Sequence, residues 1–299
     1  MLDSVGRYVE FAKSTLPSKV RFDGLKVVVD CANGAAYRTA PDSLRDLGAD
    51  VTVMANSPDG FNINEGCGAV HPEALAARVV ETGADIGIAL DGDADRLIMV
   101  DEKGVVIDGD QLLACLTGTM REAGTLTGGG IVGTMMTNGG IEPFLDGLGL
   151  ALHRTKVGDR YVPEAMRQND INLGGESSGH ILMTSLSTSG DGLIAALQML
   201  RLLAQDDRPA SELFHLFTPK CQKMENLRGF DRSVLDLPAV VAGLAAIESG
   251  LAGKGRLLVR ASGTESLLRV MVEADDSALV DSTIDEIILL IKAEANNNK

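Results

Sequence analysis

The chain has 299 residues, enough for about two domains, or for three small ones. Hydrophobic residues make up 45% and charged residues 23%, which is ordinary for a globular protein. The net charge of −15 argues against DNA or RNA as a partner, because their phosphates would repel the chain. Any local cluster of basic residues is therefore a candidate site for a small anion.

The cysteine pattern and the apolar segments limit the class of protein further. Cys31, Cys67, Cys115 and Cys221 are widely spaced and form no CxxC pair, so we expect reduced thiols and neither a zinc site nor a disulfide framework. The most apolar predicted helix, 192–204, is too short to span a bilayer. We expect a cytoplasmic protein with no signal peptide and no membrane partner.

Alternating helices and strands follow along the chain. Residues 4–16 place apolar side chains at helical spacing, which predicts a connecting helix between domains, so we expect a further segment to precede it. The predicted first domain, 1–107, then contains strands at 25–30, 49–54, 85–90 and 97–101, with helices ending near 47 and spanning 71–81. This alternation favours an α/β fold with a mostly parallel sheet.

Two further domains are predicted. In residues 108–218 the pattern indicates helices at 110–123, 141–148, 161–167 and 191–204, strands at 130–136, 150–156 and 180–183, and a loop at 172–179. In residues 219–299 it indicates strands at 257–260 and 267–273 and a closing helix at 278–293. This last part is expected to be a smaller α+β domain.

The segment DGDADR, residues 91–96, is the clearest candidate for chemistry. Asp91, Asp93 and Asp95 follow a buried strand, where α/β proteins place ligand sites. At a separation of ~5 Å and an effective dielectric of ~20, each carboxylate pair repels by roughly 3 kcal/mol, and a hard cation with oxygen ligands would relieve this. A solvated acidic turn and a phosphatase with Asp91 as nucleophile are alternatives. An EF-hand fits poorly, because Arg96 stands where that loop needs glycine.

Three more loops combine glycine with polar or basic groups. GGESSGH, residues 174–180, offers hydroxyls, Glu176 and a histidine that could transfer protons. RASGTES, residues 260–266, and Arg269 combine hydroxyls with flanking guanidinium groups, which suits a phosphate. KVGDRY, residues 156–161, brackets a glycine with Lys156 and Arg160. Taken alone, each of the first two loops could equally be an ordinary turn, and KVGDRY is better interpreted as a charged helix cap.

Taken together, these loops resemble the α-D-phosphohexomutase family. The order DGDADR, KVGDRYV, GGESSGH, RASGTES is the family's order, and VVVDCANGAAY, NIN and RVMVE resemble the branch that acts on glucosamine phosphates. The resemblance runs across essentially the whole chain. It implies two consecutive phosphohexomutase-type α/β domains with mixed sheets, which carry the metal loop and the sugar loop. A smaller α+β C-terminal domain that binds phosphate would follow them.

The resemblance also implies roles for single residues. Asp91, Asp93 and Asp95 would bind Mg²⁺. His180 and Arg96 would be catalytic, the former as general acid or base and the latter on the phosphoryl oxygens. The residues expected to bind a phosphorylated hexosamine are Lys156, Arg160, Glu176, Ser178, Arg260, Ser262, Gly263, Thr264 and Arg269.

The sequence departs from the family in two ways. No segment resembles the family's phosphoserine loop, so we expect this chain alone to interconvert glucosamine 6-phosphate and glucosamine 1-phosphate poorly or not at all. In the last loop, Ser266 and Ala261 stand where proline is common, which would loosen the loop. A non-catalytic fragment that binds sugar phosphate or metal, or a phosphoglucomutase or phosphomannomutase, are the alternatives. The sequence does not predict an oligomeric state.

Overall fold

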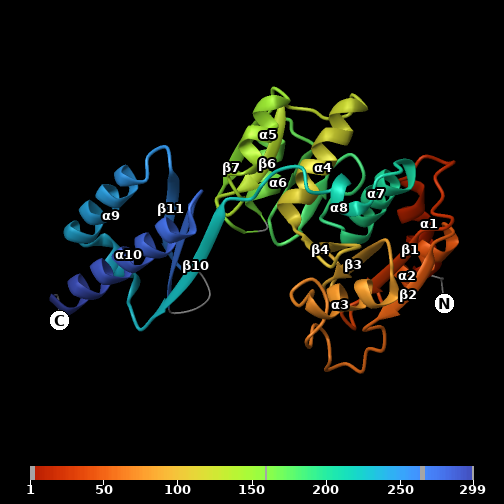
Figure 1. Cartoon of the computed structure of the whole chain (residues 1–299), viewed down its shortest axis with the longest axis horizontal. Coiled ribbons are helices and arrows are strands. Elements are labelled where there is room, and N and C mark those ends of the chain that lie inside the picture. Colours follow the sequence, from red (N-terminus) through yellow and green to blue (C-terminus); the bar gives the residue numbers. More distant parts are fainter. Residues whose placement is uncertain (1–3, 159, 263–266, 298–299) are drawn as a thin grey trace. The chain divides into compact units, whose positions relative to one another are not determined.

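The computed structural model describes residues 4–158, 160–262 and 267–297. The chain divides into two compact units (Figure 1). Unit 1 comprises Met1–Thr137 and Ile141–Phe217, and unit 2 comprises Asn138–Gly140 and Thr218–Lys299.

The first sheet of unit 1 has the strand order β2–β1–β3–β4–β5. Its strands are β1 (Lys26–Asp30), β2 (Asp50–Met54), β3 (Ile86–Leu90), β4 (Leu97–Asp101) and β5 (Val106–Ile107). β1 pairs in parallel with β2 and β3, whereas the β3–β4 and β4–β5 pairs are antiparallel. β3 and β4 are buried along their whole lengths, which explains their nearly unbroken apolar sequences. The helices that accompany this sheet are α1 (Ser4–Ser14), α2 (Thr39–Asp46) and α3 (Glu73–Thr82).

The second sheet of unit 1 has the order β7–β6–β8–β9. Its strands are β6 (Gly130–Thr134), β7 (Ala151–Thr155), β8 (Leu173–Gly175) and β9 (Ile181–Met183). β6 is parallel to β7 and β8, and β8 is antiparallel to β9. The accompanying helices are α4 (Gly109–Glu122), α5 (Ile141–Gly147), α6 (Tyr161–Gln168), α7 (Gly192–Gln205) and α8 (Ala210–Leu213). Aspartates cap two of them: Asp108 accepts the N–H of Gln111 in α4, and Asp191 accepts that of Ile194 in α7.

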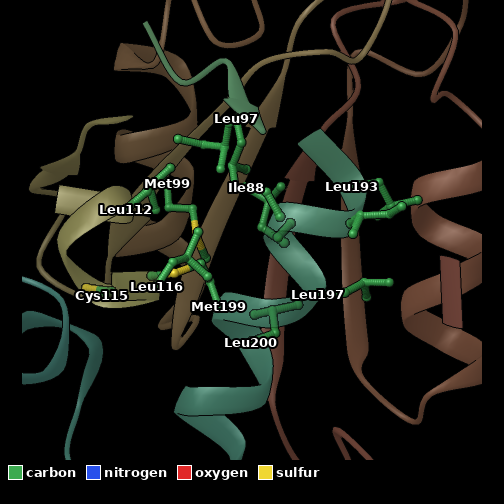
Figure 2. Close-up of a cluster of buried hydrophobic side chains, with 14 of the residues drawn as sticks. Ile88, Leu97, Met99, Leu112, Cys115, Leu116, Leu193, Leu197, Met199 and Leu200 are labelled. Atoms are coloured by element: carbon green, nitrogen blue, oxygen red, sulfur yellow. The ribbon is translucent and has the colours of Figure 1, made fainter. Parts of the chain in front are cut away.

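One hydrophobic core spans the two predicted α/β domains of unit 1. Figure 2 shows Ile88 and Met99, from β3 and β4, among side chains of helices α4 and α7. Leu116 and Leu197 are examples from these helices, and both are at most 2% exposed. Each buried side chain of this size stabilises the fold by about 1.5–3 kcal/mol relative to its exposed state. The two strands that flank the acidic loop are therefore anchored in the shared core.

Unit 2 is an antiparallel sheet with helices. Its strands β10 (Cys221–Arg228), β11 (Gly255–Ala261) and β12 (Leu267–Ala274) have the order β10–β12–β11. The helical elements are η1 (Arg232–Asp236), α9 (Pro238–Gly250) and α10 (Ser277–Asn297). Val270 and Val272 of β12 pack with Ile284 and Ile287 of α10 in a separate core. Arg269 and Glu273 alternate with these valines along β12 and therefore lie on the opposite face of the sheet.

The structure confirms the fold class, two α/β parts with mixed sheets followed by a smaller α+β part. Several individual elements differ from the prediction. The first sheet is mixed, as the family resemblance implies, and not mostly parallel, as the alternation of helices and strands favoured. Residues 173–175, predicted as loop, form β8, because they pair with neighbouring strands on both sides. β10 and α9 were not predicted. The strand β10 is largely exposed and lacks an apolar alternation, and α9 is rich in alanine and glycine, without a clear polar face.

The predicted boundary at 107/108 lies within unit 1, and the three predicted domain ranges remain a prediction. Across the described ranges, no helix combines the length and apolar character needed to cross a membrane.

Candidate functional site

The acidic loop, residues 91–96, connects β3 to β4. β3 ends at Leu90 and β4 begins at Leu97, so the loop lies between two antiparallel, fully buried strands. Strands on both sides exclude the helix–loop–helix arrangement of an EF-hand. The anchored ends limit how far the three carboxylates can move apart.

The three aspartates of this loop gather into one group. One carboxylate oxygen from each of Asp91, Asp93 and Asp95 lies within 4.8 Å of the others. Asp91 is buried and accepts the N–H of Arg96 at 3.1 Å. Burial raises the pKa of Asp91, and the charges of Asp95 and Asp93 raise it further, against the opposing effect of the Arg96 backbone hydrogen bond. This crowding of negative charge is the state that a cation would relieve.

The donor set fits Mg²⁺. All three side chains offer oxygen, the ligand atom that this hard cation prefers. The Oδ1 atom of Asp95 is shielded from solvent and accepts no hydrogen bond from the described residues. Arg96 Nε lies 3.7 Å from Asp91 and 3.8 Å from Asp95, so its positive charge compensates only part of the three negative charges. The residues present can therefore hold a divalent cation.

A turn that follows β1 supports the acidic loop from one side. The N–H of Ala35 donates to the carbonyl of Gly92 at 2.8 Å. A Cβ on Gly34 would lie 2.7 Å from the Gly92 Cα atom, so only glycine permits this approach. On another side, a Cβ on Gly92 would meet Ile63 and Asn64. The sequence did not predict these contacts with the acidic loop, although the CANGA segment that contains Gly34 is part of the family resemblance.

The sugar loop, residues 174–180, lies directly against the acidic loop. The N–H of Leu97 donates to the carbonyl of Gly179 at 3.0 Å, and Arg96 and His180 form an antiparallel bridge. Gly179 has φ 91°, and a Cβ there would lie 2.7 Å from the carbonyl carbon of Leu97. Glycine at this position lets the two loops join through their backbones.

His180 faces the acidic loop. Its Nδ1 lies 2.9 Å from Oδ2 of Asp95, and its side chain is 12% exposed. The ring therefore limits the positions open to the Asp95 carboxylate. Its predicted role as a general acid or base remains a prediction.

The other residues predicted in the sugar loop face the segment before α6. Glu176 accepts the N–H of Gly158 at 3.4 Å, and Ser178 Oγ lies 3.4 Å from Glu176. Arg160 is exposed and donates to the hydroxyl of Tyr161 at 2.8 Å. Lys156 is exposed, and Asp159 lies outside the described residues. Glu176 and Ser178 thus belong to the same side of unit 1 as the KVGDRY segment.

Unit 2 carries the predicted phosphate-binding residues. Arg260 of β11 lies directly opposite Arg269 of β12 in the strand register. Burial lowers the pKa of Arg260, and the charge of Arg269 lowers it further, so an anion would stabilise the pair. The N–H of Ser262 donates to Leu267 at 2.9 Å. Gly263 and Thr264 lie outside the described residues.

Asn226 of β10 is a polar neighbour of this pair that the sequence did not indicate. The register places Asn226 opposite Arg269, on the side away from Arg260, and its side chain is exposed. The three residues therefore form one row across the sheet. Since β10 was not predicted as a strand, no sequence signal connected Asn226 with the two arginines.

Comparisons with known proteins agree with this arrangement. Models of the phosphoglucomutase/phosphomannomutase family match residues 6–104 as alpha/beta/alpha domain II, 108–220 as alpha/beta/alpha domain III and 222–290 as the C-terminal domain. The phosphoglucosamine mutase of Paramagnetospirillum magneticum is 53% identical over 296 residues, which are 98% of this chain and 66% of that protein. The phosphoglucosamine mutase of Granulibacter bethesdensis is 53% identical over 99% of this chain and 65% of its own length. The chain thus spans just under two thirds of the length of these relatives.

Solved structures share the fold. A phosphoglucomutase/phosphomannomutase family protein from Burkholderia thailandensis has a TM-score of 0.80 at 24% identity, over 98% of this chain and 65% of that one. The N-acetylphosphoglucosamine mutase of Aspergillus fumigatus, solved with GlcNAc-6P and magnesium, has a TM-score of 0.77 at 22% identity, over 96% and 65%.

The fold and the loops define an α/β protein of the phosphohexomutase type, with a candidate cation site in its acidic loop. The chain belongs to the phosphoglucomutase/phosphomannomutase family, and the curated relatives that it is similar to are phosphoglucosamine mutases. The family resemblance seen in the sequence is confirmed.

Proposed function

We propose that this chain carries the metal-, sugar- and phosphate-binding parts of a phosphoglucosamine mutase. The reaction interconverts glucosamine 6-phosphate and glucosamine 1-phosphate through a 1,6-bisphosphate, with Mg²⁺ as cofactor. The observation that carries the proposal is the direct junction of the acidic loop and the sugar loop, through Leu97 to Gly179 at 3.0 Å and through Asp95 to His180 at 2.9 Å. A junction of this kind supports a cation and a sugar held side by side.

In the acidic loop, Asp91, Asp93 and Asp95 would hold Mg²⁺. When bound, the ion neutralises negative charge on a phosphoryl group and aligns its oxygens. The Arg96 guanidinium, within 4 Å of two of these carboxylates, is positioned to orient further phosphoryl oxygens.

Each unit carries its own candidate residues for binding a sugar phosphate. The Glu176 carboxylate would accept hydrogen bonds from sugar hydroxyls, and the Ser178 hydroxyl would accept or donate them. Lys156 and Arg160 would supply positive charge near the same loop. His180 would move a proton at the reacting hydroxyl. The residues proposed to grip the phosphate that does not react are Arg260, Ser262, Gly263, Thr264 and Arg269. Binding energy from that remote phosphate orients the reacting end of the sugar.

The phosphoryl donor of the family, a phosphoserine, has no counterpart among these 299 residues. We therefore expect transfer to need a phosphoserine domain in addition to the residues described. Four free cysteines, three of them buried, fit the cytoplasm as the place of this reaction.

A coupled assay that follows conversion of glucosamine 1-phosphate to glucosamine 6-phosphate tests the proposal. The purified 299-residue chain is compared with a fusion of the chain to the part of the Paramagnetospirillum relative that the chain does not cover. We expect turnover from the fusion only, and none from its Asp93→Asn variant. Robust turnover by the chain alone would contradict the need for a separate donor.

Substrate choice and the phosphatase alternative need their own measurements. Calorimetric titrations of the chain with the 6-phosphates of glucosamine, glucose and mannose should rank glucosamine first. A preference for glucose or mannose would move the assignment to a phosphoglucomutase or phosphomannomutase. Release of inorganic phosphate that disappears in Asp91→Asn, without isomer formation, would favour an aspartyl phosphatase.

A further inference from the structure

A hydrogen-bonded path connects helix α1 to the acidic loop. The hydroxyl of Tyr8, in α1, lies 2.8 Å from both carboxylate oxygens of Asp191. Asp191 Oδ1 also accepts the N–H of Ile194 and so caps α7. The next residue, Gly192, donates its N–H to the carbonyl of Ala94 at 2.9 Å. Ala94 lies between two of the candidate metal ligands.

The same short segment touches the acidic loop at a second point. A Cβ on Gly190 would lie 2.5 Å from Nε2 of His180, so the backbone of Gly190 packs closely on the imidazole ring. The other ring nitrogen of His180 is the one that lies 2.9 Å from Asp95. A Cβ on Gly192 would lie 2.6 Å from the carbonyl oxygen of Arg96. Glycines at positions 190 and 192 therefore allow the segment to lie against both the backbone and the histidine.

Ala94 needs such support more than most loop residues. Its φ of 63° is in the left-handed region, which a residue with a Cβ rarely adopts. Strained backbone of this kind persists only where surrounding contacts determine it. The hydrogen bond from Gly192 is one of these contacts, and its direction depends on how Asp191 and α7 are fixed.

We propose that Tyr8 and Asp191 are positioning residues for the acidic loop, fixing Ala94 and Asp95 in the arrangement that binds Mg²⁺. The inference rests on the proposed function in one respect only, the identity of the ion. Neither residue touches the candidate ligands, and both act through Gly192 and through the packing of Gly190 on His180.

The chemistry of the pair suits a fixed support. Burial raises the pKa of Tyr8, and the neighbouring Asp191 carboxylate raises it further, so the hydroxyl remains protonated and a donor throughout the neutral range. The acceptor is a carboxylate, and hydrogen bonds to charged groups are stronger than those between neutral groups. Partners in the outer shell of a metal site typically change metal affinity by about 10–100-fold, and a residue one contact further away should change it less.

Tyr8→Phe removes the hydroxyl and leaves the ring in place. Thr15→Val is the matched control, because Thr15 directly follows α1 and accepts a hydrogen bond from Gln198 of α7 at 3.1 Å, away from the loop. Hydrogen exchange in the metal-free protein is followed by mass spectrometry in peptides that cover residues 91–97 and 190–194. Mg²⁺ affinity is measured by calorimetry on the same proteins, and the midpoint of urea unfolding is recorded for each.

We expect Tyr8→Phe to accelerate exchange in both peptides and to weaken Mg²⁺ binding about fivefold, while Thr15→Val changes neither even if it lowers the unfolding midpoint. Asp191→Asn keeps an oxygen that can cap α7 and accept the Tyr8 hydroxyl. Its exchange rates in the two peptides and its Mg²⁺ affinity should therefore be closer to those of wild type than the values of Tyr8→Phe. The inference is overturned if exchange in the two peptides is the same in Tyr8→Phe as in wild type, or if Thr15→Val accelerates it equally. If wild-type protein binds no Mg²⁺, the proposed metal is contradicted. The exchange comparison would still decide whether Tyr8 and Asp191 position the acidic loop.

Discussion

Replacing Gly179 by alanine should separate the two loops of the candidate site. Gly179 has φ 91°, and an alanine in the left-handed region costs about 1–2 kcal/mol. The new methyl group would also overlap the backbone of Leu97, with the Leu97 carbonyl carbon at only 2.7 Å. Forcing one methyl group into packed surroundings typically costs a further ~1–3 kcal/mol. We expect a total loss of about 2–5 kcal/mol in the free energy of unfolding.

Gly60 provides the matched control for backbone strain. Its φ is 93°, and an added Cβ would meet no atom within 4 Å. Gly60→Ala should therefore cost at most the backbone part, about 1–2 kcal/mol. The difference of about 1–3 kcal/mol between the two variants isolates the contact with Leu97.

Urea unfolding followed by tyrosine fluorescence measures this difference. The chain has three tyrosines and no tryptophan, and Tyr8, Tyr37 and Tyr161 all belong to unit 1, so the signal reports the unit in question. Gly179→Ala should also weaken Mg²⁺ binding. Separation of the two loops moves His180 away from Asp95, so the ring no longer limits the position of that carboxylate. Equal losses of stability in the two alanine variants would refute the proposed close junction of the loops.

Three further outcomes are expected. Glu273→Gln should destabilise unit 2 by about 1.5–3 kcal/mol, because Glu273 is 1% exposed and pairs with Arg256 at 2.8 Å. Glu225→Gln should cost less than about 1 kcal/mol, because the Glu225 side chain is 43% exposed. Hydrogen exchange in β12 measures both. Burial tends to raise the pKa of Glu273, but Arg256 and its hydrogen bonds outweigh burial and hold that pKa below the ordinary value. The stability that Glu273 adds over glutamine should therefore be complete at neutral pH and disappear as the pH falls below about 4, and a difference that persists there would contradict the sign. Of the four cysteines, only exposed Cys221 should react quickly with a thiol reagent in the native protein, and fast labelling of a second thiol would be the contrary result.

Much of unit 1 could be predicted from the sequence because its signals are local. The strands on either side of the acidic loop are apolar runs that end at charged residues. The three aspartates between them indicate a candidate cation site from the local sequence alone. The fold class and the family resemblance are confirmed. The roles of the individual site residues remain predictions, supported in unit 1 by the contacts of Asp95, Gly179 and His180.

The features that could not be predicted depend on contacts between distant parts of the chain. Tyr8 and Asp191 are separated by 183 residues, and neither has a local pattern that indicates the other. β8 is three residues long and exists because β6 and β9 pair with it. β10 is exposed along most of its length, so its strand character comes from the backbone ladder with β12 and not from an apolar alternation.

The central claim is that the acidic loop binds Mg²⁺ in an arrangement shared with the sugar loop. A calorimetric titration of the 299-residue chain with Mg²⁺, in wild type and in Asp93→Asn, tests it most directly. Asp93 is the exposed member of the three, so its substitution removes a ligand without disturbing the core. We predict saturable binding to a single site in wild type and its loss in the variant. No binding in wild type, or binding that Asp93→Asn leaves unchanged, would contradict the account.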